Sequence, residues 1–481
     1  MRPYSVFLTD EDIQTIHNNS LDILENTGFM MPSDEALKYM ESFGCEVDHK
    51  TQIVKIKPEL VQDSIDKATK KKDLVLYGQI PEHDMHFSDD KVRFGTMTNC
   101  THVLVDAEKR IRRPCTTEDV INATRLLDHF DNYDMVGALL NQQDVPPALV
   151  DWYCWAYQLI NTKKHLIGTA VGTQSIRDVK NMAIAILGSE KAFNERCPLS
   201  FYILCRPPLQ IDRLSLESLM ECAKLRIPVS VSCGTIAGAT GPVTLAGNIV
   251  QSHAEVLATL VLSQQINPGT PFMYGAYCRS MDMKTGNIGM SSPEWTIMKA
   301  ATGQMGKFLG LPMRQASLLR DAKIPDAQAG YESGITGMIA AICGTDMIDG
   351  IELDSDIMAD MGDIAMNNEI IGYIKYVMKG MDVNENTMAM EAIKKVGHGG
   401  NYMGHKHTMQ NYKTQRWEFG ITERQVWEKW MKEGGKDFYQ KAKEQADGLI
   451  AAGWEPYVSP EVEKEVVGIA ERANIDYSKS I

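Results

Sequence analysis

Residues 310–332, GLPMRQASLLRDAKIPDAQAGYE, decide the fold, because this stretch passes from an apolar strand through a cluster of charges into a helix. The apolar piece at 311–313 leads directly into Arg314, and Arg320 and Asp321 follow before Pro325 and the helix. A strand that ends in charged groups just before a helix is typical of (β/α) enzymes, which place their chemistry at this rim of the sheet.

The same strand–helix order repeats through the middle of the chain. Continuous apolar runs predict parallel strands buried on both faces, at residues 135–140, 165–170, 199–205, 228–234, 271–277, 311–317 and 347–353. Helical patterns separate them, at residues 148–160, 175–187, 213–225, 243–265, 293–309 and 327–343. Seven repeats over about 250 residues predict a closed (β/α)8 TIM barrel, whose eighth strand the sequence does not locate. An open doubly wound sheet is the alternative, although no G-x-G-x-x-G follows a first strand.

Changes in pattern divide the chain into three parts. The pattern of residues 1–115 predicts a mixed α/β extension of short helices and strands. The pattern of residues 116–385 predicts the barrel core. Residues 386–481 combine a glycine-rich loop with two or three amphipathic helices. Trp427, Trp430 and Trp454 lie in or near these helices, where tryptophan is typical of packing or of a subunit contact. We therefore expect a homo-oligomer.

Composition excludes several classes of function. The 481 residues carry a net charge of −14, which disfavours nucleic acid or an anionic membrane as the main partner. The ten cysteines include no C-x-x-C pair, so a zinc ribbon or iron–sulfur site is disfavoured and buried free thiols are expected. The N-terminus has no secretion signal, and no apolar run is long enough to span a bilayer. We expect a cytoplasmic protein.

Two glycine-rich stretches are candidates for the barrel mouth. In CGTIAGATGPVTLAG, residues 233–247, Gly234, Gly238 and Gly241 allow a sharp turn or a close approach of the backbone to a ligand. A phosphate loop is the alternative, but the lysine of G-x-x-x-x-G-K-[ST] is missing. GHGGNYMGHKHTM, residues 397–409, offers histidines in the spacing of a metal site, but no carboxylate or cysteine. We expect instead a loop that closes over the mouth, with the polar residues His398, Asn401, His405 and His407.

Charged and aromatic residues at other strand ends complete the candidate site. Arg314 and Arg320 present planar guanidinium groups that match a carboxylate, although an ion-pair network is the plain structural alternative. Tyr274 and Tyr277 end the fifth predicted strand, and an aromatic ring suits a quaternary ammonium. Carboxylates end the seventh strand and either attract such a cation or act as acid and base, namely Glu352, Asp354 and Asp356.

These segments together resemble the trimethylamine methyltransferase superfamily over nearly the whole chain. The resemblance is carried by TGPVTLAG, PGTPFMYGAY, the opening stretch, NNEIIGYIKYVMKG and VGHGGNYMGHKHT. Founding members of that superfamily contain pyrrolysine, and this sequence has none. The resemblance therefore implies the non-pyrrolysine branch, whose members demethylate quaternary amines such as glycine betaine, proline betaine, carnitine or γ-butyrobetaine. It also implies a TIM barrel and, as methyl acceptor, the Co(I) corrinoid (cobalamin) of a separate partner protein, as in anaerobic one-carbon metabolism.

The expected chemistry needs no covalent or acid–base catalytic residue, because a quaternary ammonium releases a neutral amine. The enzyme must orient one methyl group in line with cobalt and exclude water. No metal and no tightly bound cofactor are expected on the chain itself. We assign Arg314, or failing that Arg320, to a substrate carboxylate, and Tyr274, Tyr277 and Tyr331 to the ammonium. Glu352 and Asp354 are further pocket candidates.

Asp321, Lys323 and Asp326 are expected to form the frame that fixes the two arginines. Two rival interpretations stay open. One is a lyase or hydrolase on the same barrel, using Asp321 or Glu352 with a histidine. The other is a barrel that binds a betaine or a corrinoid protein without turnover. Formation of methylated corrinoid only in the presence of a quaternary amine separates methyl transfer from both.

Overall fold

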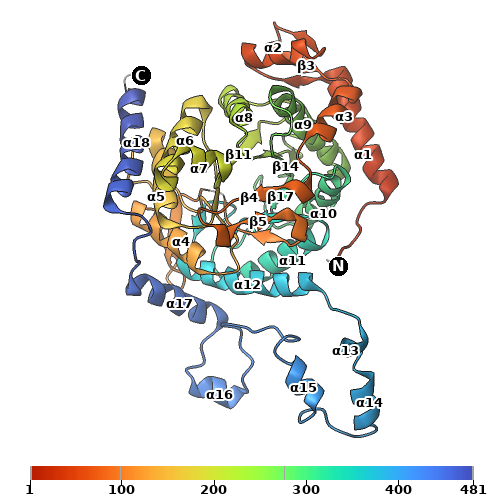
Figure 1. Ribbon diagram of the computed structural model, residues 1–481, viewed down its shortest axis with the longest axis vertical. Helices are drawn as coiled ribbons and strands as arrows, with labels where there is room; N and C mark the ends of the chain where they lie inside the picture. The colour runs from red at the N-terminus through yellow and green to blue at the C-terminus, as the bar shows by residue number, and fades with distance from the viewer. Residues whose placement is uncertain (1–2, 98, 276, 479–481) are drawn as a thin grey trace.

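A sheet of eight parallel strands forms the centre of the molecule, which we describe from a computed structural model that defines residues 3–97, 99–275 and 277–478. The strand order is β6-β18-β17-β14-β12-β11-β10-β9, and Figure 1 shows helices surrounding it on all sides. The predicted TIM barrel is confirmed. Its strands are β6 (Arg93–Phe94), β9 (Met135–Gly137), β10 (His165–Gly168), β11 (Leu199–Cys205), β12 (Val229–Cys233), β14 (Phe272–Gly275), β17 (Met313–Ala316) and β18 (Met347–Asp349).

The eighth strand, β6, comes from the N-terminal segment. It pairs in parallel with β18, so the barrel includes a strand from the part of the chain that was expected to precede it. On its other side β6 meets β9 through a seam of individual hydrogen bonds. The Asp134 amide donates to the Phe94 carbonyl at 2.7 Å, and the Thr96 hydroxyl donates to the Gly137 carbonyl at 2.9 Å. The seam closes the barrel.

One helix follows each strand and covers the outside of the barrel. Sequence signals start several of these helices: Thr116 forms a capping box for α4, Ser292 and Pro293 begin α10, and Asp326 caps α11. The outer helices are α4 (Thr117–His129), α5 (Val150–Asn161), α6 (Gly172–Leu187), α8 (Arg213–Leu225), α9 (Leu245–Ile266), α10 (Pro293–Phe308), α11 (Ala327–Ile342) and α12 (Met361–Lys379). A short helix, α7 (Glu190–Glu195), follows α6.

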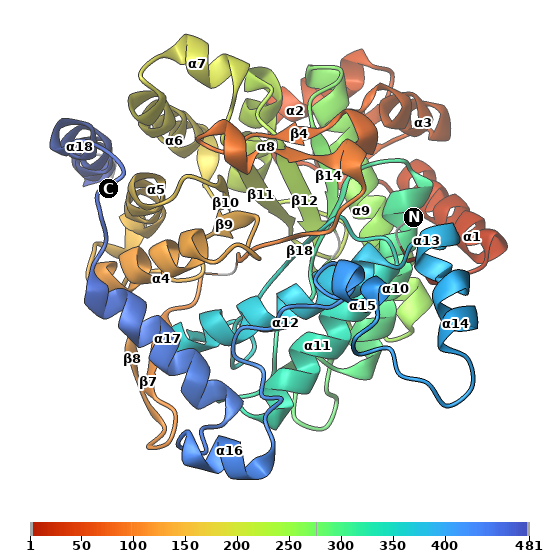
Figure 2. The ribbon, with the colours of Figure 1, turned by 60° about the horizontal axis from the view of Figure 1, so that its bottom comes forward.

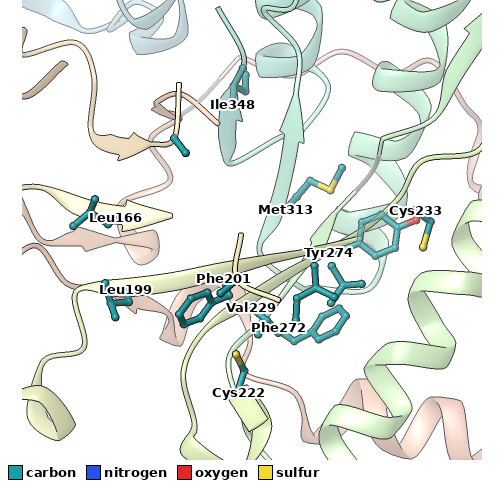
Figure 3. Close-up of a cluster of buried hydrophobic side chains, with 14 of the residues drawn as sticks. Leu166, Leu199, Phe201, Cys222, Val229, Cys233, Phe272, Tyr274, Met313 and Ile348 are labelled. Carbon is teal, nitrogen blue, oxygen red and sulfur yellow. The ribbon is translucent and has the colours of Figure 1, made fainter. Parts of the chain in front are cut away.

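The main hydrophobic core lies between the strands and this layer of helices. Figure 3 shows side chains from neighbouring strands pointing to the same side of the sheet, among them Leu166, Phe201, Val229 and Phe272. Among the described residues, α9 is the one helix long and apolar enough to cross a membrane, and 78% of its most apolar window is buried inside the protein. Its apolar character therefore matches its place in this core.

The N-terminal segment covers one side and one end of the barrel. Helices α1 (Asp10–Asp22) and α3 (Pro58–Lys67) pack on α9. The hairpin β4 (Val75–Leu76) and β5 (Met85–His86) lies across the amino end of the barrel in Figure 1 and packs its apolar side chains on lumen residues such as Met135 and Met347. The remaining elements are a π-helical turn (Ile23–Thr27), β1 (Phe29–Met30), α2 (Asp34–Ser42), β2 (Glu46–Asp48) and β3 (Ile53–Lys55).

Two small sheets stand at the carboxyl ends of the barrel strands. The first joins β19 (Met358–Ala359), β7 (His102–Asp106) and β8 (Ile111–Pro114). The second joins β13 (Ile236–Ala237), β15 (Arg279–Met281) and β16 (Ile288–Gly289), and it carries the first glycine-rich stretch. Since β4 and β5 fill the amino end, the carboxyl end is the mouth of the barrel.

The C-terminal part leaves the barrel and returns to it. The short helices α13 (Glu385–Met388), α14 (Met390–Val396) and α15 (Lys406–Asn411) project outward below α12 in Figure 1. The chain then passes α16 (Trp427–Lys432) to α17 (Phe438–Ala452), which packs on α12. The last helix, α18 (Pro460–Ser478), packs on α5 and α6.

Candidate active site

A buried ion pair lies in the lumen of the barrel. In β17, Arg314 points into the lumen and its guanidinium donates to both carboxylate oxygens of Asp349 in β18, each at 2.6 Å. The neighbouring residue Gln315 points the other way and donates to the Lys299 carbonyl of α10. The guanidinium carbon of Arg314 also lies 4.1 Å from the ring centroid of Tyr202 in β11. Arg314 therefore bridges strands on different sides of the barrel.

The environment keeps Arg314 charged although it is fully buried. Burial opposes the charge, but Asp349 more than offsets this cost, so the pKa of Arg314 lies above its ordinary value. Each guanidinium hydrogen bond to Asp349 is charge-assisted and the pair is bidentate, which makes it rigid. The pair thus forms a fixed polar floor below the mouth.

A second group of charged and aromatic residues lies above this floor, around Tyr277. Its hydroxyl donates to Asp356 at 2.6 Å. The Arg279 guanidinium lies 4.7 Å from the Tyr277 ring centroid, and the Lys299 ammonium lies 5.2 Å from the same centroid. Lys299 is also 4.7 Å from the ring of Trp295. Two cations therefore share one aromatic ring beside one carboxylate.

We define the mouth cluster as Tyr277, Arg279, Trp295, Lys299 and Asp356, and burial shifts the pKa values of Lys299 and Asp356 within it. Removal of Lys299 from water lowers its pKa to about 7, so its charge changes near neutral pH. Burial raises the pKa of Asp356, against the hydrogen bond from Tyr277 that lowers it. Groups with strongly shifted pKa values in a barrel mouth are typical of a functional site.

Local backbone structure holds the mouth cluster in place. Asp354, Ser355 and Asp356 have φ values of 55°, 55° and 78°, a left-handed conformation that costs free energy in residues other than glycine. On the other side, a Cβ added to Gly234 would lie 2.9 Å from an Nη atom of Arg279, which donates to the Gly234 carbonyl. Glycine at the end of β12 is thus required for Arg279 to lie over Tyr277.

Several buried polar atoms in this region have no hydrogen-bond partner within the described part of the chain. They are Ser232 Oγ, Arg279 Nε, Trp295 Nε1 and Asp356 Oδ1. Buried polar groups in proteins are nearly always paired. These atoms are therefore the ones that a small polar ligand in the mouth would use.

The structure brings together only part of the site predicted from sequence. Arg314, Tyr277 and Gly234 lie at the mouth or in the lumen. Tyr274 does not, because its hydroxyl bonds to His253 of α9 at 2.8 Å, and so its side chain faces the helix layer. Figure 3 shows its ring beside Cys233, on the outer side of the sheet. Tyr331 lies on α11 with 55% of its surface exposed, outside the barrel.

Two of the other predicted charges, Arg320 and Asp354, are already matched by protein partners. Arg320 donates to Asp363 in the first turn of α12 and is fully buried, so its charge is not available to a ligand. Asp354 lies 2.6 Å from Lys323 and 3.2 Å from Arg112, at the outer rim. Glu352 is fully buried beside Gly350, 3.3 Å from where a Cβ would lie there.

The carboxylates of the opening stretch hold loops and helix ends. Asp321 accepts hydrogen bonds from the Met290 amide at 3.0 Å and the Ser355 hydroxyl at 2.7 Å. Asp326 accepts from the first amides of α11. The expectation that Asp321, Lys323 and Asp326 fix the arginines is therefore wrong, because Asp349 and Asp363 do so.

The glycine–histidine stretch lies away from the mouth of its own barrel. The His405 ring caps α15 by accepting from the His407 amide, and Asn401 accepts from the Met403 amide. His398 lies in the same outward-projecting segment and is exposed. By contrast, Gly238 and Gly241 lie at β13, near the mouth, where a Cβ on Gly241 would be 2.7 Å from Asn248.

Sequence reasoning missed Arg279, Lys299, Trp295 and Asp349. Lys299 had a signal: it is a single lysine within the otherwise apolar or small residues of WTIMKAATGQM. Asp349 lies inside the predicted strand 347–353, where a buried carboxylate requires a cationic partner. Arg279 begins β15, beyond the end of β14, and nothing in the local pattern relates it to Tyr277.

The family model and the two relatives described here agree on one family, and a solved structure shows the same fold. The family model described as trimethylamine methyltransferase (MTTB) matches residues 1–474. The trimethylamine methyltransferase MttB of Desulfitobacterium hafniense is 34% identical over 92% of this chain and 88% of its own length. The glycine betaine methyltransferase of the same species, strain Y51, is 30% identical over 95% of each chain. The solved hydroxylamine complex of MtmB, at 11% identity, has the same fold with a TM-score of 0.50 over 93% of this chain and 95% of its own.

Proposed function

This chain belongs to the trimethylamine methyltransferase family, and we propose that this methyltransferase takes a methyl group from a quaternary amine that also carries a carboxylate. Glycine betaine, proline betaine, carnitine and γ-butyrobetaine are substrates of this type. The proposed acceptor is the corrinoid of a separate protein. The reaction belongs in the cytoplasm, where the ten free cysteines remain reduced.

The observation that supports a carboxylate-bearing substrate is the pair of cations on the Tyr277 ring. Arg279 is partly exposed and its Nε has no hydrogen-bond partner in the described chain, while Arg314 and Arg320 are held by carboxylates. A guanidinium binds a carboxylate through two parallel hydrogen bonds. We therefore assign the substrate carboxylate to Arg279 in place of Arg314 and Arg320. Lys299, which lies against the same tyrosine ring, adds positive charge.

The ammonium end of the substrate would face Asp356 and the edge of Tyr277. A single carboxylate, whose charge is already shared with the Tyr277 hydroxyl, attracts the cation weakly. Weak attraction is favourable here, because positive charge disappears from nitrogen as the reaction proceeds, and tight binding of the ground state would raise the barrier.

The transfer itself balances without a proton. Co(I) of the partner's corrinoid supplies the electron pair that bonds to the methyl carbon, while the pair of the breaking carbon–nitrogen bond stays on the amine. The leaving amine is neutral, so no residue of the chain must act as a general acid. The chain's own task is to fix the carboxylate, to aim one methyl group out of the mouth and to keep water away.

The sequence-based alternative, an acid–base lyase or hydrolase, gains no support from the site. Its candidate base Asp321 accepts hydrogen bonds from two backbone amides and a serine hydroxyl, which fasten the loop after β17. Its carboxylate oxygens are therefore already occupied in holding this loop.

A methyl-transfer assay tests the proposal directly. The protein is incubated with a Co(I) corrinoid protein and a panel of the four betaines, choline and trimethylamine, and the loss of Co(I) absorbance is followed. We expect a signal with at least one betaine and none with choline or trimethylamine. A signal with trimethylamine alone, or none with any amine, would contradict the proposed substrate class.

Variants then test the carboxylate site. Arg279→Met should raise KM for the betaine by about 10- to 100-fold, since a charge-assisted hydrogen bond is lost, with a smaller effect on kcat. Lys323→Met is the matched control, because Lys323 is a cation paired with Asp354 at the outer rim. Equal KM values in the Arg279 variant and in the control would remove Arg279 from the proposed role.

A further inference from the structure

The outward-projecting segment 381–416, which we call the arm, makes no extensive contact with another helix or strand of the described residues. Among the described residues, all hydrogen bonds of residues 382–414 join residues of the same segment, such as His407 to the Asn386 carbonyl. The arm is attached only at its two ends, through α12 and through the Gln415 carbonyl, which accepts from the Tyr376 hydroxyl. Figures 1 and 2 show it outside the barrel and its helices.

The arm exposes a large amount of apolar surface. Met403 is 84% exposed and Met409 is 69% exposed. Val383, Met390, Ile393 and Tyr412 are each exposed by 48% or more. Monomeric proteins rarely present contiguous apolar surface of this kind, and it typically marks an interface. Methionine, being flexible, adapts well to such contacts.

An exposed apolar groove lies on the same molecule. An apolar groove of about 600 Å³ runs between α11 and α12 and is lined by Ile335, Met338, Tyr373 and Trp417. Ile335 and Tyr373 are each 55% exposed. The groove lies beside the root of the arm, because Trp417 packs edge-on against Tyr373 with the ring centroids 5.7 Å apart.

We propose that the arm binds the groove between α11 and α12 on a second copy of this chain, so that two copies exchange arms about a twofold axis. Because arm and groove are on one molecule, a twofold axis lets each copy give and receive the same contact, which closes the assembly. The proposal goes beyond the methyl-transfer function and does not depend on it.

Charge supports a second copy as the occupant. The arm, residues 381–416, carries five cationic side chains and three carboxylates and so has a net charge of +2, whereas the whole chain has a net charge of −14. A basic arm is therefore attracted to the acidic body of another copy.

The expected lifetime of the contact also favours a second copy over the corrinoid protein. The corrinoid protein must dissociate in each turnover, whereas interfaces rich in apolar side chains are typical of permanent homodimers.

Sedimentation velocity of the full chain, with arm and control variants, tests the proposal. We expect a dimer or a higher even oligomer for the natural sequence. The double variant Met390→Asp, Ile393→Asp should raise the dissociation constant at least about 100-fold, because it places two charges in an apolar contact. Leu214→Asp is the matched control, an exposed apolar residue of α8 at 41%, and should assemble as the natural chain does.

Photo-cross-linking keeps the test independent of the folding of any variant. A benzophenone amino acid at position 409 should yield a product of twice the chain mass, with linked peptides from α11 or α12 of another copy. A monomer at all concentrations, or assembly that the arm variant leaves unchanged, would overturn the proposal. Cross-links formed only to added corrinoid protein would overturn it as well.

Discussion

Replacement of Glu255 by glutamine should change how the stability of the protein depends on pH. Glu255 lies in α9 behind the barrel wall and is fully buried. One of its carboxylate oxygens accepts from the Leu209 amide at 2.8 Å and from the Gln251 side chain at 2.9 Å. Burial nevertheless raises the pKa of Glu255 from 4.5 to about 7. The carboxylate therefore becomes charged inside an apolar layer when the pH rises above neutral.

The sign of the effect follows from proton binding. Between pH 4.5 and pH 7 the unfolded chain has released this proton and the folded chain has kept it, so stability falls as pH rises. Above pH 7 the loss is complete and amounts to about 3 kcal/mol, from a shift of roughly 2.5 pKa units at 1.36 kcal/mol each. Glutamine cannot ionise, and its carbonyl oxygen can still accept both hydrogen bonds. Glu255→Gln should thus be nearly neutral at pH 5 and stabilising at pH 8.5.

Urea unfolding at pH 5.5, 6.5, 7.5 and 8.5 measures the difference between variant and natural chain. Other titrating groups cancel in this difference. Glu190→Gln is the control, because Lys180 lowers the pKa of Glu190 through a hydrogen bond. Glu190 is therefore ionised in both the folded and the unfolded chain from pH 5.5 to 8.5, and its difference should not change with pH. A Glu255→Gln difference that is constant with pH, or that grows toward acid, would refute the reasoning.

Three further predictions concern the mouth and the lumen. Asp349→Asn should destabilise the protein by about 3–5 kcal/mol, because it leaves the buried charge of Arg314 unpaired, and the double variant Arg314→Met, Asp349→Leu should recover much of this loss in thermal unfolding. An equal loss in single and double variants would contradict a pairwise interaction. Since the pKa of Lys299 is about 7, Lys299 loses its charge and kcat/KM for a betaine should fall as pH rises through 7. The Lys299→Met variant should have a low kcat/KM already at pH 6 and show no such fall when rates are measured from pH 6 to 9. If kcat/KM of the variant still fell as pH rises through 7, another group would be responsible for the titration. Gly234→Ala should raise KM several-fold by displacing Arg279, whereas Gly330→Ala, where a Cβ meets open space, should leave KM unchanged; similar KM values for the two variants would show that Arg279 tolerates the added methyl group.

The layer of strands and helices could be predicted because its signals are local. Runs such as LSFYILC are apolar throughout, as in a parallel strand covered on both faces, and the helices begin at residues such as Asp326 and Pro293. A strand was expected at β6, but its place as the eighth strand of the barrel could not be predicted, because only Arg93 and Phe94 pair with β18. Two residues carry no periodicity, and their partner is remote in sequence.

The site was only partly predictable because its contacts join different strands. Arg314 stands out in the sequence, but its partner Asp349 can be identified only when β17 and β18 are known to be neighbours. Tyr274 and Tyr277 look alike in sequence, and a strand buried on both faces gives no alternation that tells lumen from helix layer. The histidines of the arm looked like mouth residues because a sequence does not show whether a loop folds back or projects outward.

The origin of β6 has a consequence for synthesis on the ribosome. This strand is translated before every other strand of the barrel, yet its ladder partner Met347 emerges about 250 residues later, after roughly 10–50 s at ordinary elongation rates. By the end of that interval the sequences of seven barrel strands have been translated. These strands can associate into a sheet, but the barrel stays open at the β6–β18 junction. A shortened chain that ends before β18 could not close it. We therefore expect release from nascent-chain chaperones to follow translation of residue 349, whatever the pace of the earlier strands.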